Sequence, residues 1–465
     1  MALNDMTRGK ELKSIVLFTL PLLVGNVFQQ LYSMVDMVVV GRLVGANALA
    51  AVAASAPITF VLLSLMMGLT QGGSVILSQY FGAKQEKMVR RAVSNLIWVT
   101  LGAGVLVTIL GLILSRPLLE LLRTPAEILD DAATYMMIFF GGVIFPFVFN
   151  GLSAIFRALG DSRTPLYFLI VTTLLNIVLD IWFVASFSMG VAGVAWATII
   201  SQAVSAFLCI GYILIKKIPA FSIPKEDWAL DKEIFKKTLR LGLPTSFQQV
   251  LLSTGMMFMQ GLINSYGSIA TAAMGASMRI EQIATMPAMS VGMAMTTFTG
   301  QNIGANKLDR VHNGYVRALW ATIGFTALLS MVVLFCGPLL LELFLDGSKD
   351  RAVIDMGVRA LNVLGYFLVA FGIMNVTGGI MRGAGDVMFN TIASATIQVA
   401  RVASGYTLHF LGIGEACLWW SLPIAWIAAT ILQLIRYWTG GWKKRTLIKR
   451  EEQLAGAEEE ALPQE

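Results

Sequence analysis

Long segments without a single charged residue constrain this chain more than any other feature of its sequence. Clear examples are residues 15–34, 139–156, 166–179 and 324–341. A helix needs about 20 apolar residues to cross the ~30 Å hydrocarbon core of a bilayer. Charged residues make up only 13% of the sequence, about half of the ~25% that is usual in soluble domains. The sequence therefore predicts an all-α integral membrane protein, with the lipid bilayer as its surroundings.

Apolar runs that end at charged residues or at Gly/Pro breaks predict twelve transmembrane helices. Several of them exceed 20 residues, which allows tilt or extension beyond the membrane. The expected ranges are 14–40, 47–78, 88–115, 127–156, 165–187, 190–216, 236–265, 270–300, 312–342, 353–381, 388–410 and 413–438.

Every second loop between these spans is rich in Lys and Arg, whereas the other loops carry few basic residues. The basic set includes Lys84 to Arg91, the central stretch from Lys216 to Arg240, and both chain ends. Because cytoplasmic loops carry the excess of Lys and Arg, both termini and the central loop are expected in the cytoplasm of a bacterial cell. The formal net charge of +6 then reflects membrane topology, and no nucleic-acid partner is expected.

The second half of the chain repeats the first with an offset of a little over 220 residues. Leu20-Pro21 in the first span recurs as Leu243-Pro244 in the seventh. Further matching pairs are Gln79/Gln301, Gly82/Gly304, Asn150/Asn375, Arg157/Arg382 and Asp161/Asp386. Six spans in each half give both halves the same orientation, so a pseudo-two-fold axis along the membrane normal should relate two six-helix bundles.

The repeat also sets the expected domain boundaries. They are a cytoplasmic N-terminus at residues 1–13, an N-terminal bundle at 14–216, a cytoplasmic linker at 217–235, a C-terminal bundle at 236–438 and a cytoplasmic tail at 439–465. The tail is rich in Glu, Ala and Gln and is expected to be disordered.

Ionisable residues inside the spans are few, and each costs roughly 2.5–3.5 kcal/mol at mid-bilayer on insertion scales. In the first span, Gln29, Tyr32 and Ser33 precede Asp36 by seven, four and three residues. This spacing places all four side chains on one face of a helix. An ion pair between Asp36 and Arg42 is the structural alternative, but such a pair does not require the polar stripe.

In the fifth span, Asn176 lies one helical turn before Asp180. Asp36 and Asp180 both fall toward the outer side of the N-terminal bundle, where they could face one internal cavity. A sheltered carboxyl group there could carry a proton or bind Na⁺, so Asp36, Asn176 and Asp180 are the predicted cation-coupling residues. A helix-packing network around Asn176 is the rival interpretation.

The second half carries a different set of polar residues. Glu281 in the eighth span and Arg401 in the eleventh span lie near mid-depth, and either a structural pair or a role in transport would explain them. The position that matches Asp36 has no acid, and the nearest residues are Phe258, Met259 and Gln260. The predicted substrate-cavity residues are Gln29, Tyr32, Ser33, Asn150, Met257, Gln260, Glu281 and Arg401.

Taken in order, several short motifs make the chain resemble the multidrug and toxic-compound extrusion (MATE) family, over residues 15–438. The motifs are Leu20-Pro21, Val35-Asp36 before Gly41, Gln79 with Gly82-Ala83, Arg157 to Asp161, Leu175 to Asp180, and Gly300 to Ala305. The branch of DNA-damage-inducible and staphylococcal-type exporters is the most similar. The resemblance implies a monomeric exporter of lipophilic or cationic compounds by alternating access, driven by antiport of H⁺ or Na⁺. Asp36, Asn176 and Asp180 occupy the matching positions of the coupling site, and no other cofactor is implied.

Two other functions are weighed against export. A flippase for lipid-linked oligosaccharides, from the related superfamily, would need a cationic cavity, and few basic residues such as Arg279 and Arg401 are available inside the spans. An intramembrane prenyltransferase would need two Asp-rich motifs to hold Mg²⁺, and the second half offers none. An enzyme is therefore not expected.

Overall fold

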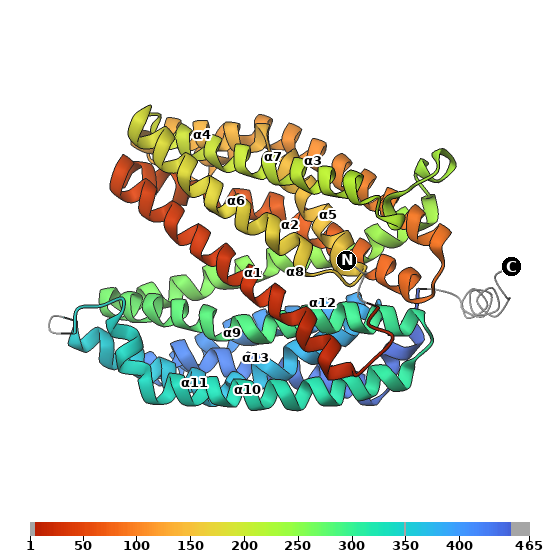
Figure 1. Ribbon diagram of the computed structural model, residues 1–465. Helices are drawn as coiled ribbons and strands as arrows, with labels where there is room; N and C mark the ends of the chain where they lie inside the picture. The colour runs from red at the N-terminus through yellow and green to blue at the C-terminus, as the bar shows by residue number, and fades with distance from the viewer. Residues whose placement is uncertain (1–4, 348–349, 448–465) are drawn as a thin grey trace, which may run out of the picture. The chain divides into compact units, whose positions relative to one another are not determined.

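The computed structural model describes residues 5–347 and 350–447. Within these residues the chain forms thirteen α-helices joined by short turns and contains no strand (Figure 1). The helices are α1 Glu11–Val39, α2 Ala46–Gly82, α3 Glu86–Leu121, α4 Ala126–Gly141, α5 Ile144–Ala158, α6 Arg163–Ile181, α7 Gly190–Lys216, α8 Lys232–Ser265, α9 Gly267–Gly304, α10 Leu308–Glu342, α11 Arg351–Gly383, α12 Val387–Phe410 and α13 Cys417–Trp438.

The predicted fourth span is broken into two helices. The chain bends by 49° between α4 and α5, next to the Gly141-Gly142 pair. Counting this bent pair as one span gives twelve spans in the described residues, as the sequence predicts. Eight single helices are long and apolar enough to cross a membrane by themselves, and the bent pair is a ninth. The other three, α8, α9 and α12, contain no window that is equally apolar over the same length.

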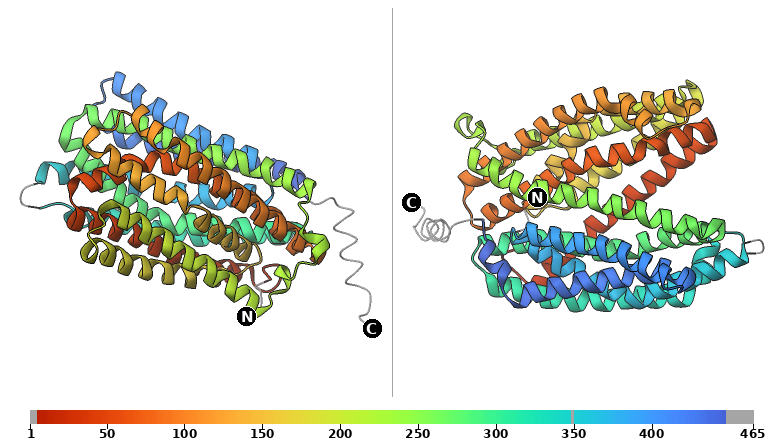
Figure 2. Two further views of the ribbon diagram at one scale, coloured as in Figure 1. Left: turned by 90° about the horizontal axis from the view of Figure 1, so that it is seen from above. Right: turned by 180° about the vertical axis from the view of Figure 1, so that it is seen from behind.

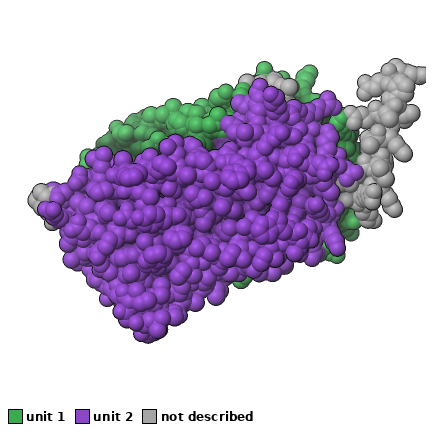
Figure 3. Space-filling view, turned by 90° about the horizontal axis from the view of Figure 1, so that it is seen from below, with its two compact units in different colours: residues 1–5, 20–247, 450–465 green, residues 6–19, 248–449 purple. Residues whose placement is uncertain are grey.

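Two compact units divide the chain (Figure 3). Their boundaries fall inside helices: residues 6–19 belong to the second unit although residues 20–247 form the first, and residues 248–449 complete the second. Thus α1 and α8 each run without a break from one unit into the other. The predicted disordered tail starts at residue 439, but Gly441–Arg445 form a 3₁₀ helix with Trp442 buried. The tail from residue 448 lies outside the described residues.

In the first unit, α2, α3, α4, α5 and α7 form a bundle (Figure 2). Aromatic and aliphatic side chains from these helices fill its interior. The start of α8 packs closely on α2 in this unit. A Cβ atom placed on Gly72 would lie only 2.7 Å from the backbone nitrogen of Gly242 and 3.0 Å from the carbonyl oxygen of Thr238. These two helices therefore approach each other where only glycine fits.

The second unit is built around α11, which packs against α9, α10 and α13. The segment that precedes α1 is bound to this unit at the turn between α9 and α10. Met6 is fully buried, and its backbone N–H donates to Gln301 Oε1 at 3.0 Å. Arg310 donates hydrogen bonds to the carbonyl oxygens of Met6, Arg8 and Gly9 at 2.7–3.3 Å. The N-terminal segment is therefore an integral part of the second unit.

The internal repeat is visible in the backbone as well as in the sequence. Lys84 and Asn306 follow α2 and α9, and both adopt φ = 56°. In each case the residue and its successor donate backbone hydrogen bonds to carbonyls three and five residues earlier, which closes the helix end. Asn150 Nδ2 donates to the Pro146 carbonyl at 2.9 Å, as Asn375 does to the carbonyl four residues before it at 3.0 Å. The matched residues therefore hold equivalent local structures.

Candidate functional site

The first unit brings Asp36 of α1 and Asp180 of α6 together, although 144 positions separate them in the sequence. The two carboxyl groups are close enough to interact electrostatically. Asp36 is partly buried and Asp180 is completely buried. Arg42 is exposed, and within the described residues no ion pair joins it to Asp36. The structure thus pairs Asp36 with a second acid.

A π-helical turn follows each of the two acid-bearing helices. Val40–Val44 continues from α1 and Trp182–Ser186 continues from α6, and the two turns pack against each other and against α7. The i→i+5 turn is rare and often occurs at functional sites. Asp36 and Asp180 lie within the last turn of regular helix before these segments, so the altered backbone begins directly beside the acid pair.

Polar groups from α4 and α7 complete the surroundings of the acids. The Tyr32 hydroxyl lies 3.3 Å from the Thr198 hydroxyl, which links α1 to α7. Tyr135 of α4 lies within electrostatic range of both acids. Gln202 lies one helical turn beyond Thr198 and is therefore on the same side of α7. Sequence reasoning missed Tyr135, Thr198 and Gln202, because a single polar residue in an apolar span gives no sign of its neighbours.

Several buried polar atoms in this unit have no hydrogen-bond partner in the described part of the chain. They include Asp36 Oδ1, both side-chain polar atoms of Asn176, both carboxylate oxygens of Asp180, Ser201 Oγ and Gln202 Oε1; Arg90 Nε, Asn95 Oδ1 and Ser153 Oγ of the same unit also have none. Each unsatisfied buried group costs about 1–3 kcal/mol. Polar atoms without partners, close together, are what a site for a proton, a small cation or water requires.

The acid cluster contains only two carboxylates and one side-chain amide as oxygen ligands. Among the described residues, no group of three or more His, Cys, Asp or Glu side chains could hold a metal ion. Asp36, Asp180 and the amide oxygen of Asn176 instead supply two carboxylates and one neutral oxygen. This set suits one proton or one monovalent cation.

Three other predicted cavity residues, Gln29, Met257 and Gln260, are exposed. Gln29 is exposed, and its carbonyl oxygen accepts a hydrogen bond from the Ser33 hydroxyl at 3.1 Å. Met257 is exposed on α8, and Gln260 Nε2 donates to Asn264 Oδ1 at 2.8 Å. Within the part of the chain that the structure describes, these hydrogen bonds are local to α1 and to α8.

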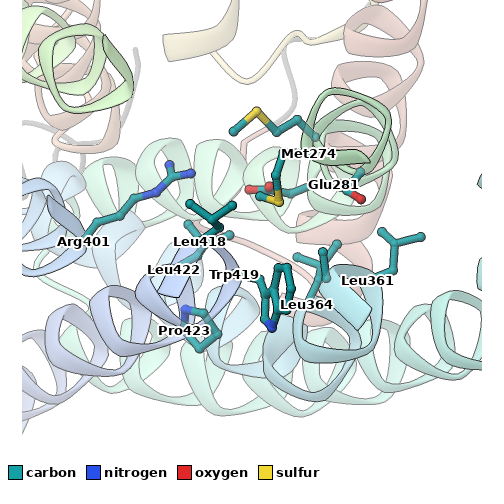
Figure 4. Close-up of a pocket in the computed structure, with 12 residues that line it drawn as sticks. Met274, Glu281, Leu361, Leu364, Arg401, Leu418, Trp419, Leu422 and Pro423 are labelled. Atoms are coloured by element: carbon teal, nitrogen blue, oxygen red, sulfur yellow. The ribbon is translucent and has the colours of Figure 1, made fainter. Parts of the chain in front are cut away.

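Glu281 of α9 and Arg401 of α12 line one cavity of about 20 Å³ inside the second unit. Figure 4 shows the two side chains extending toward each other from opposite sides of this cavity. The described residues include no ion pair within 4.0 Å between them, although they interact electrostatically. The sequence predicted that the two could be partners; the structure places them as neighbours across a gap.

The fold defines a class of protein: a multi-pass membrane protein built from two repeats, with two acids close together in its first unit. The MatE family model matches the chain twice, at residues 21–182 and 244–407. The "Probable multidrug resistance protein YpnP" of Bacillus subtilis is 32% identical over 96% of this chain and 99% of its own length. A "Multidrug export protein MepA" of Staphylococcus saprophyticus is 25% identical over 91% of this chain and 93% of its own length.

A solved structure described as the "Outward-facing conformation of a multidrug resistance MATE family transporter of the MOP superfamily" has a TM-score of 0.89 and 25% identity. The match covers 96% of this chain and 99% of that chain. The chain belongs to the MATE family of multidrug efflux transporters. It is a transporter and not an enzyme.

Proposed function

We propose that this protein exports lipophilic or cationic organic compounds in exchange for inward movement of H⁺ or Na⁺, by alternating access. The observation that carries the proposal is the meeting of Asp36 and Asp180, from separate helices, in a buried cluster with unsatisfied oxygen atoms. Buried acids within membrane spans are costly and mark ion pathways and proton relays. Asn176, one turn from Asp180, supplies the neutral oxygen of the coupling site.

The chemistry follows from charge. Two ionised carboxylates about 4 Å apart repel each other by about 4 kcal/mol at an effective dielectric constant near 20. A proton shared between them, a Na⁺ ion, or the cationic group of a cargo molecule relieves this repulsion. Because all three compete for the same negative charge, the coupling ion and a cationic cargo are bound in mutually exclusive states.

Ion entry therefore drives cargo release. When the coupling ion neutralises the cluster, the electrostatic hold on a cationic cargo disappears and the cargo can leave. Movement of one net charge across the membrane adds about 2.3 kcal/mol per 100 mV of potential. The protein acts as a monomer in the bacterial cytoplasmic membrane. The distribution of Lys and Arg between loops supports an orientation with both termini in the cytoplasm, so that export moves cargo away from that side.

Reconstitution in liposomes tests the proposal. Efflux of a fluorescent lipophilic cation is followed under an imposed pH gradient and, separately, under an imposed Na⁺ gradient. Asp36→Asn should abolish gradient-driven efflux without changing the thermal unfolding of the purified protein. Asp130→Asn removes an exposed carboxylate of the same unit and should transport normally. Undiminished efflux by Asp36→Asn would refute the assignment of the coupling site.

A further inference from the structure

Two opposite charges face each other inside the second unit without direct contact. Glu281 of α9 and Arg401 of α12 line one cavity and extend toward each other across it (Figure 4). Among the described residues, no nitrogen and oxygen of the two side chains come within 4.0 Å. Arg401 is only 7% exposed, and its Nε atom has no hydrogen-bond partner in the described chain. A buried donor without an acceptor is costly, so the gap lies where a hydrogen bond is needed.

The size of the cavity limits what can lie between the two charges. Its volume is about 20 Å³. One water molecule needs about 10–15 Å³, so the space holds one water and is too small for an organic group. Two hydrogen bonds of about 2.8 Å that meet at one water oxygen join atoms roughly 4.5–5.5 Å apart. Such a span suits two charges that do not reach a direct ion pair.

We propose that this cavity binds one water molecule, which joins Glu281 to Arg401 through hydrogen bonds. Arg401 Nε donates to the water oxygen, and the Glu281 carboxylate accepts one of the water protons. Ser277, one helical turn before Glu281, also lines the cavity. Its hydroxyl donates to the Gly357 carbonyl at 3.4 Å, which leaves its oxygen lone pairs to accept the second proton. These three hydrogen bonds are the usual number for a buried water.

Charge balance selects water over an ion. Glu281 and Arg401 carry opposite unit charges, so the cavity between them is neutral overall. Arg401 would repel a cation and Glu281 would repel an anion, whereas both attract a neutral dipole in the same orientation. Other parts of the wall, such as Met274, Leu364 and Leu418, are apolar and add no further hydrogen bond.

The water links two helices that have different packing neighbours. In the described chain, α9 packs against α10 and α11, whereas α12 packs mainly against α13. Either charge alone would be a buried ion without a counter-charge, which is strongly unfavourable. Glu281, Arg401 and the water together cross-link α9 to α12 in the interior of the second unit. The inference therefore goes beyond the proposed export and does not depend on ion coupling at Asp36.

Hydroxyl-radical labelling of the purified full-length protein tests for the water. An X-ray pulse splits bound water into radicals, which oxidise the side chains beside it, methionine among them. Met274 lines the cavity and is 7% exposed, whereas Met374 is 8% exposed and does not line it. Met274 should be oxidised severalfold more than Met374, and Arg401→Leu should make the two equal. Equal oxidation of the two in the wild type would show a dry cavity and overturn the proposal.

A double-mutant cycle in thermal unfolding tests the bridge itself. Glu281→Gln leaves Arg401 without a counter-charge and should lower the unfolding temperature. Adding Arg401→Leu removes both charges, so the double variant should unfold at a higher temperature than Glu281→Gln alone. The exposed pair of Arg359 and Glu415, 2.8 Å apart, is the control, and its cycle should be close to additive because surface ion pairs contribute little.

Additive losses for Glu281→Gln and Arg401→Leu would also overturn the proposal. The labelling comparison uses the wild type, so it decides the question even if a variant does not fold. Neither assay uses an ion gradient, so a failure here is distinct from a failure of transport.

Discussion

The contact between α2 and the start of α8 gives a stability prediction whose size follows from the coordinates. In Gly72→Ala the added Cβ would meet the Gly242 nitrogen at 2.7 Å and the Thr238 carbonyl oxygen at 3.0 Å. Both are backbone atoms of a helix, so they cannot rotate away as a side chain would. Overpacking of this kind costs about 1–3 kcal/mol, and the two helices must separate to relieve it.

A matched glycine in the same unit isolates the packing effect. Gly102 lies inside α3, and a Cβ placed there meets no atom within 4 Å. Gly102→Ala should therefore stabilise the helix by up to about 1 kcal/mol. The two variants should differ by about 1–4 kcal/mol, which is roughly 2–16 °C at the 2–4 °C per kcal/mol of a domain of 150–250 residues.

Thermal unfolding of the purified variants in one detergent measures this difference. Gly72→Ala should unfold below the wild type, and Gly102→Ala at or above it. Equal unfolding temperatures for the two variants would refute the close approach of α2 and α8 as the reason for glycine at position 72.

Two further predictions concern polar contacts. Arg310→Ala removes a largely buried side chain that binds the Met6 carbonyl and its neighbours. A hydrogen bond to a charged group contributes about 1.5–3 kcal/mol. The N-terminal segment that precedes α1 should therefore detach from the second unit and become sensitive to trypsin at its basic residues. Arg116→Ala, which removes an exposed ion-pair partner, should leave the digestion pattern unchanged, and identical patterns for both variants would contradict the docking. Tyr32→Phe removes the hydroxyl that contacts Thr198. Because a neutral hydrogen bond contributes about 0.5–1.5 kcal/mol, this variant should slow ion-driven efflux severalfold. Its unfolding temperature should fall by only a few degrees. Efflux at the wild-type rate would show that this contact has no role in coupling.

Much of the architecture could be predicted from the sequence because its causes are local. A charge-free run of about 20 residues must be helical in a bilayer, since every backbone polar group needs a partner inside the helix. Asp36 and Asp180 could also be identified from the sequence, because an ionisable side chain inside a membrane span is costly and usually has a function. The repeat of Asn150 as Asn375 is also a property of the sequence alone, and the structure gives both residues the same hydrogen bond.

Other features arise only when helices far apart in the sequence pack together. The unit boundaries inside α1 and α8 leave the apolar patterning unchanged and so give no sequence signal. The apolar run also continues through Gly141-Gly142, so the pattern predicts one span where the structure has the bent pair α4 and α5. The proximity of Tyr135 to the acids depends on α4 packing against α7, which also packs against α6.

Glu281 and Arg401 show the same limit. The sequence identifies two opposite charges near mid-depth in the second bundle, but only the packing of α9 against its neighbours leaves a cavity between them instead of a direct ion pair. Helix formation and the cost of a buried charge are decided residue by residue, so the sequence alone determined the spans and the acids. Distances between side chains depend on how whole helices fit together, so only the tertiary structure decided which charges meet.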